Sequence, residues 1–217
     1  MKKIVISVPH YKCPEDYNPL EHDHRNHPCD WVAGPVAKVL KKKLEAKGFN
    51  VVVILGDKAR KQEIDLNRPE GRNTDFRAKL DEELKDSDLL IDCHSFPKDS
   101  IKYQKWELVV FKSPYDKQQI AQSMFQIMKN LGLNVALQPA FTRDSIINDE
   151  VKNGHVAVLI EHNEDLDIEM ITDFEVEAIE QFLTGKKSKM STVLQVVKEK
   201  FKDDEEEAWL LEDTTKR

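Results

Sequence analysis

Short apolar runs alternate with amphipathic segments along the first 185 residues. The apolar runs, rich in β-branched residues, predict buried strands at 3–9, 49–57, 88–93, 105–112, 133–138 and 155–161. Apolar positions at helical spacing predict helices at 31–47, 74–85, 114–130, 168–183 and 191–201. Strands that alternate with helices indicate an α/β fold of three layers, α/β/α, whose mostly parallel mixed sheet is covered on both faces.

The 217 residues, 40% of them hydrophobic, suit one core-forming domain followed by a tail. We assign residues 1–185 to the domain and 186–217 to a helical, acidic tail. The net charge of −7 disfavours a nucleic acid or an anionic membrane as the partner and favours a small molecule. No apolar run approaches the roughly 20 residues that span a bilayer. Composition indicates nothing about the oligomeric state.

The cysteines and the N-terminus bear on the compartment. The three cysteines form no CxxC pair, and the chain does not open with a secretory signal pattern. Both features favour a reducing, cytoplasmic setting.

Polar residues follow three of the predicted strands. His10 follows the first strand, His94 the third and Glu161 the last. Ligands of open α/β sheets collect at the carboxyl ends of the strands, and two imidazoles with a carboxylate suit a catalytic zinc ion. Taken singly, each histidine is more often a capping residue, and Glu161 would equally suit an ion pair with a nearby Lys or Arg.

Other polar residues have two interpretations each. Asp92 shares a strand face with His94, so it would orient the imidazole, act as a base beside a metal, or cap the next turn. Asn67 and Arg68 would grip a substrate carboxylate or form a surface turn, and Arg143 would do the same or be an exposed loop charge. A polar loop holds a second, metal-like group, which consists of His22, Asp23, His24 and His27.

The segments "SVPH", "CDW", "IDLNRP", "LIDCHS", "FTRDS" and "AVLIEHN" occur in the order found in the N-formylglutamate amidohydrolase family. The chain resembles that family through these scattered motifs, between about residues 3 and 165. The family is similar in fold to the zinc carboxypeptidases, so the resemblance implies a zinc-peptidase-like fold.

The resemblance also implies roles for individual residues. His10 and His94 match the zinc-binding histidines, and Asp30 in "CDW" falls where the acidic ligand is expected, with Asp23 as the substitute. Glu161 matches the glutamate that acts as general base and acid. The positions that match the binding site for the substrate's carboxylate are Asn67, Arg68 and Arg143.

The leading hypothesis is therefore a zinc-dependent amidohydrolase that cleaves the amide of an N-acyl, N-formyl-like amino acid or a small peptide-like substrate. Metal-activated water would attack the amide, with Glu161 as the general base and Asp92 as a second catalytic candidate. Another divalent first-row ion would suit the same ligands. The alternatives are a peptidoglycan or peptide amidase of the same fold and a non-catalytic protein that binds carboxylates.

Overall fold

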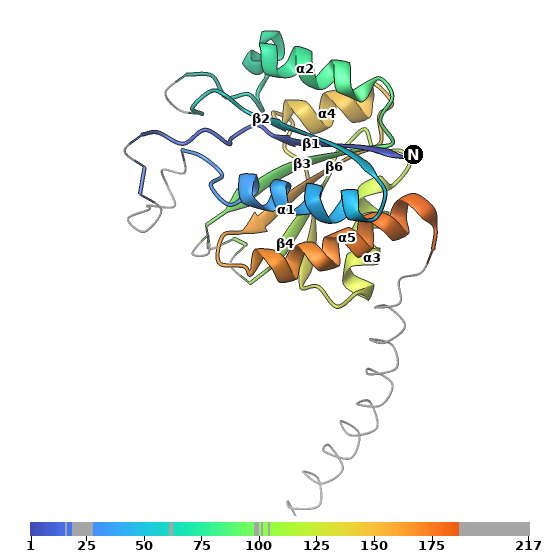
Figure 1. Ribbon diagram of the computed structural model, residues 1–217. Helices are drawn as coiled ribbons and strands as arrows, with labels where there is room; N and C mark the ends of the chain where they lie inside the picture. Colours follow the sequence, from blue (N-terminus) through green and yellow to red (C-terminus); the bar gives the residue numbers. More distant parts are fainter. Residues whose placement is uncertain are drawn as a thin grey trace, which may run out of the picture.

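One six-stranded sheet forms the centre of the protein, in the order β2-β1-β3-β6-β4-β5 (Figure 1). The computed structural model describes residues 1–15, 17–18, 28–60, 63–97, 100, 102–103 and 105–186. The strands are β1 Lys3–Val8, β2 Asn50–Leu55, β3 Leu89–Phe96, β4 Leu108–Lys112, β5 Val135–Pro139 and β6 Ala157–Asn163. β2, β1, β3 and β6 run parallel, whereas β4 pairs antiparallel with β6 and parallel with β5. The carboxyl ends of β1, β3 and β6 therefore meet at one edge.

Helices cover both faces of this sheet (Figure 1). One face packs against α1, α3 and α5, and the other against α2 and α4. The helices are α1 Ala33–Ala46, the 3-10 helix η3 Pro69–Asn73, α2 Asp75–Leu84, α3 Ile120–Asn130, α4 Ser145–Lys152 and α5 Ile168–Thr184. Each face buries its own cluster of apolar side chains, as expected for a parallel sheet that is shielded from water on both sides. The three-layer α/β/α fold is thus confirmed.

Most of the predicted elements are present, but several boundaries differ. β3 continues through Phe96 and β6 through Asn163, so His94 lies inside its strand rather than after it, and Glu161 lies inside β6 rather than at its end. The helix predicted from residue 114 begins only at Ile120, because the Asp116 carboxylate accepts the free N–H groups that open α3. α4 was not predicted at all, because its eight residues give too short a pattern for helical periodicity to be recognised.

The loops that follow β1 and β2 touch each other at the edge where the site forms. The N–H of Gly56 donates to the carbonyl of Val8 at 2.9 Å, and a Cβ at position 56 would lie 2.0 Å from the Pro9 oxygen. Only glycine allows this approach. The contact fixes the backbone just before His10.

Two predictions concern, wholly or in part, residues that the structure does not describe. The predicted helix at 191–201 and all but the first residue of the predicted tail lie outside the described residues. Within the described part of the chain, none of the helices is long and apolar enough to span a membrane.

Candidate metal centre

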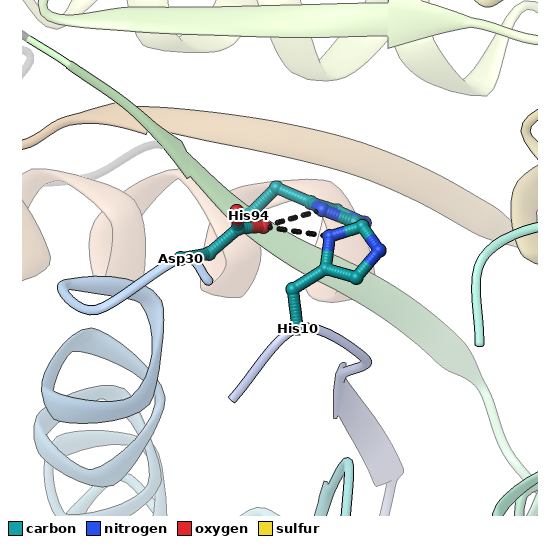
Figure 2. A group of neighbouring side chains, drawn as sticks. All are labelled: His10, Asp30 and His94. Atoms are coloured by element: carbon teal, nitrogen blue, oxygen red, sulfur yellow. Dashed lines mark hydrogen bonds and ion pairs between the residues drawn. The ribbon is translucent and has the colours of Figure 1, made fainter. Parts of the chain in front are cut away.

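His10, Asp30 and His94 converge at the carboxyl edge of the sheet (Figure 2). His10 follows β1, Asp30 precedes α1, and His94 lies on β3. One ligand atom from each lies within 4.8 Å of the other two, and the three side chains are buried. Oδ2 of Asp30 lies 3.1 Å from Nδ1 of His10 and 2.8 Å from Nδ1 of His94. The structure thus brings together the three residues that the sequence predicted as metal ligands.

The donor set and its spacing fit zinc. Tetrahedral zinc holds imidazole nitrogen and carboxylate oxygen at about 2.0–2.2 Å, which places neighbouring ligand atoms about 3.4 Å apart. The two nitrogen–oxygen distances in the cluster are within about half an ångström of that spacing. Three protein ligands leave a fourth position for water or substrate, which is the arrangement of catalytic zinc sites.

Carboxylates also hold the far nitrogens of both imidazoles. Nε2 of His10 lies 2.7 Å from Oδ1 of Asp65, and Nε2 of His94 lies 3.3 Å from Oδ2 of Asp92. Asp92 is fully buried and accepts a hydrogen bond of 2.7 Å from the Ser7 hydroxyl. Such partners fix the tautomer and the orientation of metal-binding histidines. Of the interpretations open for Asp92, the contacts favour the one in which it orients His94.

Charge is concentrated around these imidazoles. Burial alone would lower the pKa of His94, but Asp92 and Asp30 raise it well above its ordinary value. Burial opposes the shift at Asp65, yet His10, together with Arg60 and Arg68, lowers the pKa of this carboxyl to about 2. The raised pKa of His94 and the lowered pKa of Asp65 both reflect the pairing of imidazoles with carboxylates in this cluster.

Glu161 lies beside the cluster on the neighbouring strand. It pairs in register with His94, and residues paired across parallel strands point to the same face of the sheet. Neighbouring strands are only about 4.8 Å apart. Glu161 is half-buried, in contrast to the three buried ligand candidates. The structure thus places the predicted base next to the predicted metal ligands.

The residues predicted to bind a carboxylate lie close together, but their environments differ. Asn67 is buried, and its Nδ2 lies 3.4 Å from Nε2 of His94. The Arg68 guanidinium pairs with Asp144 at 2.5 Å and also donates to the carbonyl of Arg143. Arg143 is exposed, and its guanidinium lies over the Phe141 ring at 5.7 Å. Arg143 is therefore the more accessible of the two arginines.

Two functional candidates were missed by sequence reasoning. Nη1 of Arg60 lies 3.4 Å from Oδ1 of Asp30, and its Nε lies 3.6 Å from Oδ2 of Asp65. Nothing in the sequence around Arg60 indicates this position. Asp65 stands two residues before Asn67 inside the quoted segment "IDLNRP", so that motif carried a signal for it.

The second, metal-like group that the sequence offered consists of residues that the structure does not describe. Asp23, which was the substitute third ligand, and the histidines at 22, 24 and 27 lie outside the described residues. Among the residues that the structure describes, Asp30 takes the third position.

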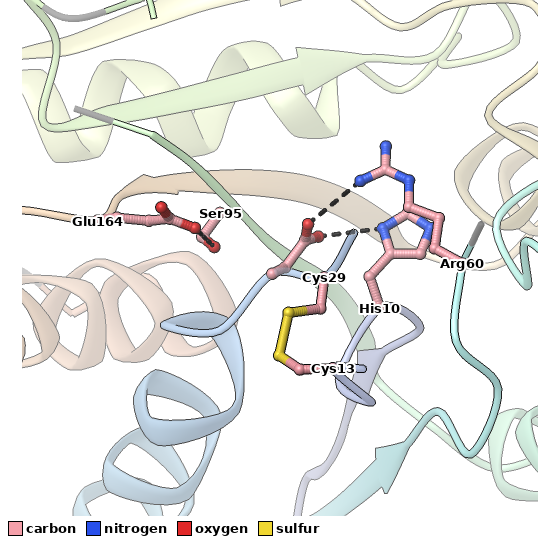
Figure 3. The surroundings of a disulfide bond; sticks show 7 residues. His10, Cys13, Cys29, Arg60, Ser95 and Glu164 are labelled. Atoms are coloured by element: carbon pink, nitrogen blue, oxygen red, sulfur yellow. Dashed lines mark hydrogen bonds and ion pairs between the residues drawn. A yellow bond between two sulfur atoms is a disulfide. The ribbon is translucent and has the colours of Figure 1, made fainter. Parts of the chain in front are cut away.

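The cysteines depart from the expectation of a reducing setting. Cys13 and Cys29 form a disulfide next to His10 (Figure 3). Cys93 is free and buried. Disulfides persist mainly in oxidising compartments, so this pair argues against the setting that the cysteine pattern favoured. The pairing was not predicted because the two cysteines are sixteen residues apart and resemble no local motif.

No family model and no curated protein matches the sequence. Solved structures do match its fold. The chain is similar to a gene product of Agrobacterium tumefaciens, with a TM-score of 0.61 and 15% identity over 85% of this chain and 91% of the other. It is also similar to the N-acetylmuramyl-L-alanine amidase of Mycobacterium smegmatis, with a TM-score of 0.56 and 12% identity over 85% and 98%. A third match is the CwlD amidase of Clostridioides difficile, solved in complex with the GerS lipoprotein, with a TM-score of 0.52 and 20% identity over 86% and 100%.

These matches show a shared fold over most of the chain. The α/β domain described above shares its fold with N-acetylmuramoyl-L-alanine amidases of solved structure. Membership of the N-formylglutamate amidohydrolase family stays a prediction, because no family model matches.

Proposed function

We propose that the protein is a zinc-dependent amidohydrolase that cleaves the amide of an N-acyl amino acid or a small peptide-like substrate. One observation carries the proposal. A buried His–Asp–His cluster of metal-ligand spacing adjoins a half-buried glutamate that is in register with one of its histidines. A metal site with a carboxylate beside it is one arrangement that can hydrolyse an unactivated amide.

The proposal assigns a role to each residue. His10, Asp30 and His94 would hold the metal, and Asp65 and Asp92 would orient the two imidazoles. Bound zinc supplies a Lewis acid for the amide carbonyl and lowers the pKa of water towards about 7. Glu161 would take the proton of the attacking water and pass it to the leaving nitrogen.

Basic residues around the cluster suit an anionic substrate. Arg60 lies at the ligand cluster itself and is partly exposed, while Arg143 lies farther out beside Arg68. In our proposal Arg143, with Asn67, binds the substrate's carboxylate. Arg68 supports them through its ion pair with Asp144.

The shared fold favours a second candidate substrate. Because bacterial cell-wall amidases have this architecture, an amide in a peptidoglycan fragment is the main alternative to a free N-acyl amino acid. Both candidates use the same site and the same chemistry. They differ only in what lies beyond the scissile bond.

Metal analysis and a single variant test the proposal. The purified chain should contain about one zinc per molecule and hydrolyse N-formyl or N-acetyl amino acids or, in the second case, muropeptides. Glu161→Gln should keep the zinc and lower kcat by roughly 10²–10⁴-fold, the usual contribution of a general base. Unchanged turnover in this variant, or a chain that binds no zinc, would refute the proposal.

A further inference from the structure

The disulfide joins the two chain segments that carry His10 and Asp30 (Figure 3). Cys13 lies three residues after His10, and Cys29 immediately precedes Asp30. The Cα atoms of the two cysteines are 5.0 Å apart, and Cys29 is fully buried. Next to this crosslink, the N–H of Asp30 donates to the carbonyl of His10 at 2.9 Å.

The three ligand candidates differ in how the fold holds them. His94 lies within a strand that is paired on both sides, and His10 directly follows a strand. Asp30 instead ends a long segment between β1 and α1 in which the described residues form no helix or strand. Its carboxylate nevertheless has to meet both imidazoles.

The disulfide shortens the covalent path that connects Asp30 to His10. Without the disulfide, the covalent path between His10 and Asp30 is about twenty residues long, and bringing the ends of such a path together costs entropy. With it, only a few residues and one S–S bond separate the two ligands. The cost of bringing Asp30 to the imidazoles is then met when the disulfide forms, before any metal binds.

We propose that Cys13 and Cys29 are positioning residues of the metal centre, whose disulfide holds the Asp30 carboxylate against His10 and His94. The inference rests on the proposed function, because it requires that these residues bind a metal. Its consequence is that metal affinity depends on the redox state of the cysteines. When a phosphine reduces the bond, the S–S bond breaks, two thiols form, and the phosphine gains the oxygen of one water molecule, whose two protons go to the thiolates.

The test measures zinc affinity in the two redox states of the full-length chain. The oxidised protein is reduced with a water-soluble trialkylphosphine, the reagent is removed under argon, and zinc is titrated against a competing chromophoric chelator. Reduction should weaken zinc binding on the order of 10–100-fold, the loss typical of disturbing the groups that support metal ligands. Reoxidation should restore the affinity, and far-UV circular dichroism checks that the reduced chain is folded.

Variants and peptide mapping complete the design. The double variant Cys13→Ser/Cys29→Ser should bind zinc as weakly as the reduced protein and should not respond to the phosphine. Cys93→Ser, as the matched control, should keep the full redox response. If the double variant fails to fold, reduction of the folded wild-type chain still carries the test.

The outcomes distinguish the positioning role of the disulfide from the metal site of the proposed function. Equal zinc affinity in the oxidised and reduced chains would overturn the positioning role and leave the metal site standing. The absence of a Cys13–Cys29 linked peptide after mild oxidation would also overturn that role. A chain that binds no zinc in either state would overturn the proposed function, and the positioning role with it.

Discussion

Two buried histidines on neighbouring strands have opposite environments. His94 on β3 and His162 on β6 lie one register position apart and therefore face opposite sides of the sheet. His94 meets Asp30 on one side, Asp92 on the other and His10 alongside. His162 contacts Glu175 of α5 at 3.0 Å, and its Nδ1 lies 2.9 Å from the carbonyl oxygen of His94.

The difference shows how a structural histidine can be told from a candidate ligand. Burial opposes protonation of His162, but Glu175 raises its pKa well above the ordinary value. Its two ring nitrogens contact Glu175 and the carbonyl oxygen of His94, so both are engaged within the protein. His94 instead shares its surroundings with a second imidazole and two carboxylates, the kinds of donor group that bind a metal cation.

The largest effect that separates the two histidines is expected in metal binding. His94→Ala removes one of three ligands, so zinc content should fall from about one per chain to nearly none, and amide hydrolysis to the background rate. His162→Gln should keep its zinc. Elemental analysis of both purified variants makes the comparison. Retention of zinc by the His94 variant would contradict the site.

The second largest effect is expected in the free energy of unfolding, when the partner of His162 is removed. Glu175→Ala leaves a buried imidazolium unpaired and should lower the free energy of unfolding by about 3–5 kcal/mol. Glu177→Ala on the same helix removes a partly exposed partner of Lys47 and should cost at most about 1 kcal/mol. Urea unfolding at fixed pH measures both. Similar losses in the two variants would show that the His162–Glu175 pair contributes no more to stability than a partly exposed ion pair.

A third effect concerns pH and a buried carboxyl on the ligand side of the sheet. Burial raises the pKa of Glu150 from 4.5 to about 7, although Arg77 opposes the shift. The folded state then binds this proton more tightly than the unfolded state, so its contribution to stability is complete below pH 4.5. That contribution is lost as the pH rises to about 7, and it amounts to about 3 kcal/mol. Glu150→Gln should flatten the loss between pH 5 and 8 in urea unfolding, and an unchanged slope would contradict the assignment.

The smallest of these effects should come from the outer partner of His10. Asp65→Asn removes the charge that orients this imidazole and should weaken zinc binding about tenfold. Asp86→Asn, at an exposed ion pair with Lys3, serves as the control and should leave the affinity unchanged. Competition with a chelator measures both. No difference between them would show that Asp65 does not support the metal site.

The predictable part of this protein is the part that local pattern encodes. Buried strands of the parallel sheet have continuous apolar runs, and His10 and His94 interrupt or follow such runs, so both the strands and these two candidate ligands were recognisable. α4 was missed because one short helix carries little periodic signal. Arg60 was missed because Asp30, its partner in the ligand cluster, comes from the separate connection between β1 and α1.

The sequence by itself determined the α/β class, most of the strands and the polar residue types near the strand ends, because hydrophobic periodicity and the succession of elements can be read along the chain. Only the tertiary structure decided which of those residues meet. It placed Glu161 in register with His94, brought His162 into contact with Glu175 of α5, and joined Cys13 to Cys29 beside Asp30. These contacts link residues that are far apart in the chain, and they form only when the sheet and its helices pack together.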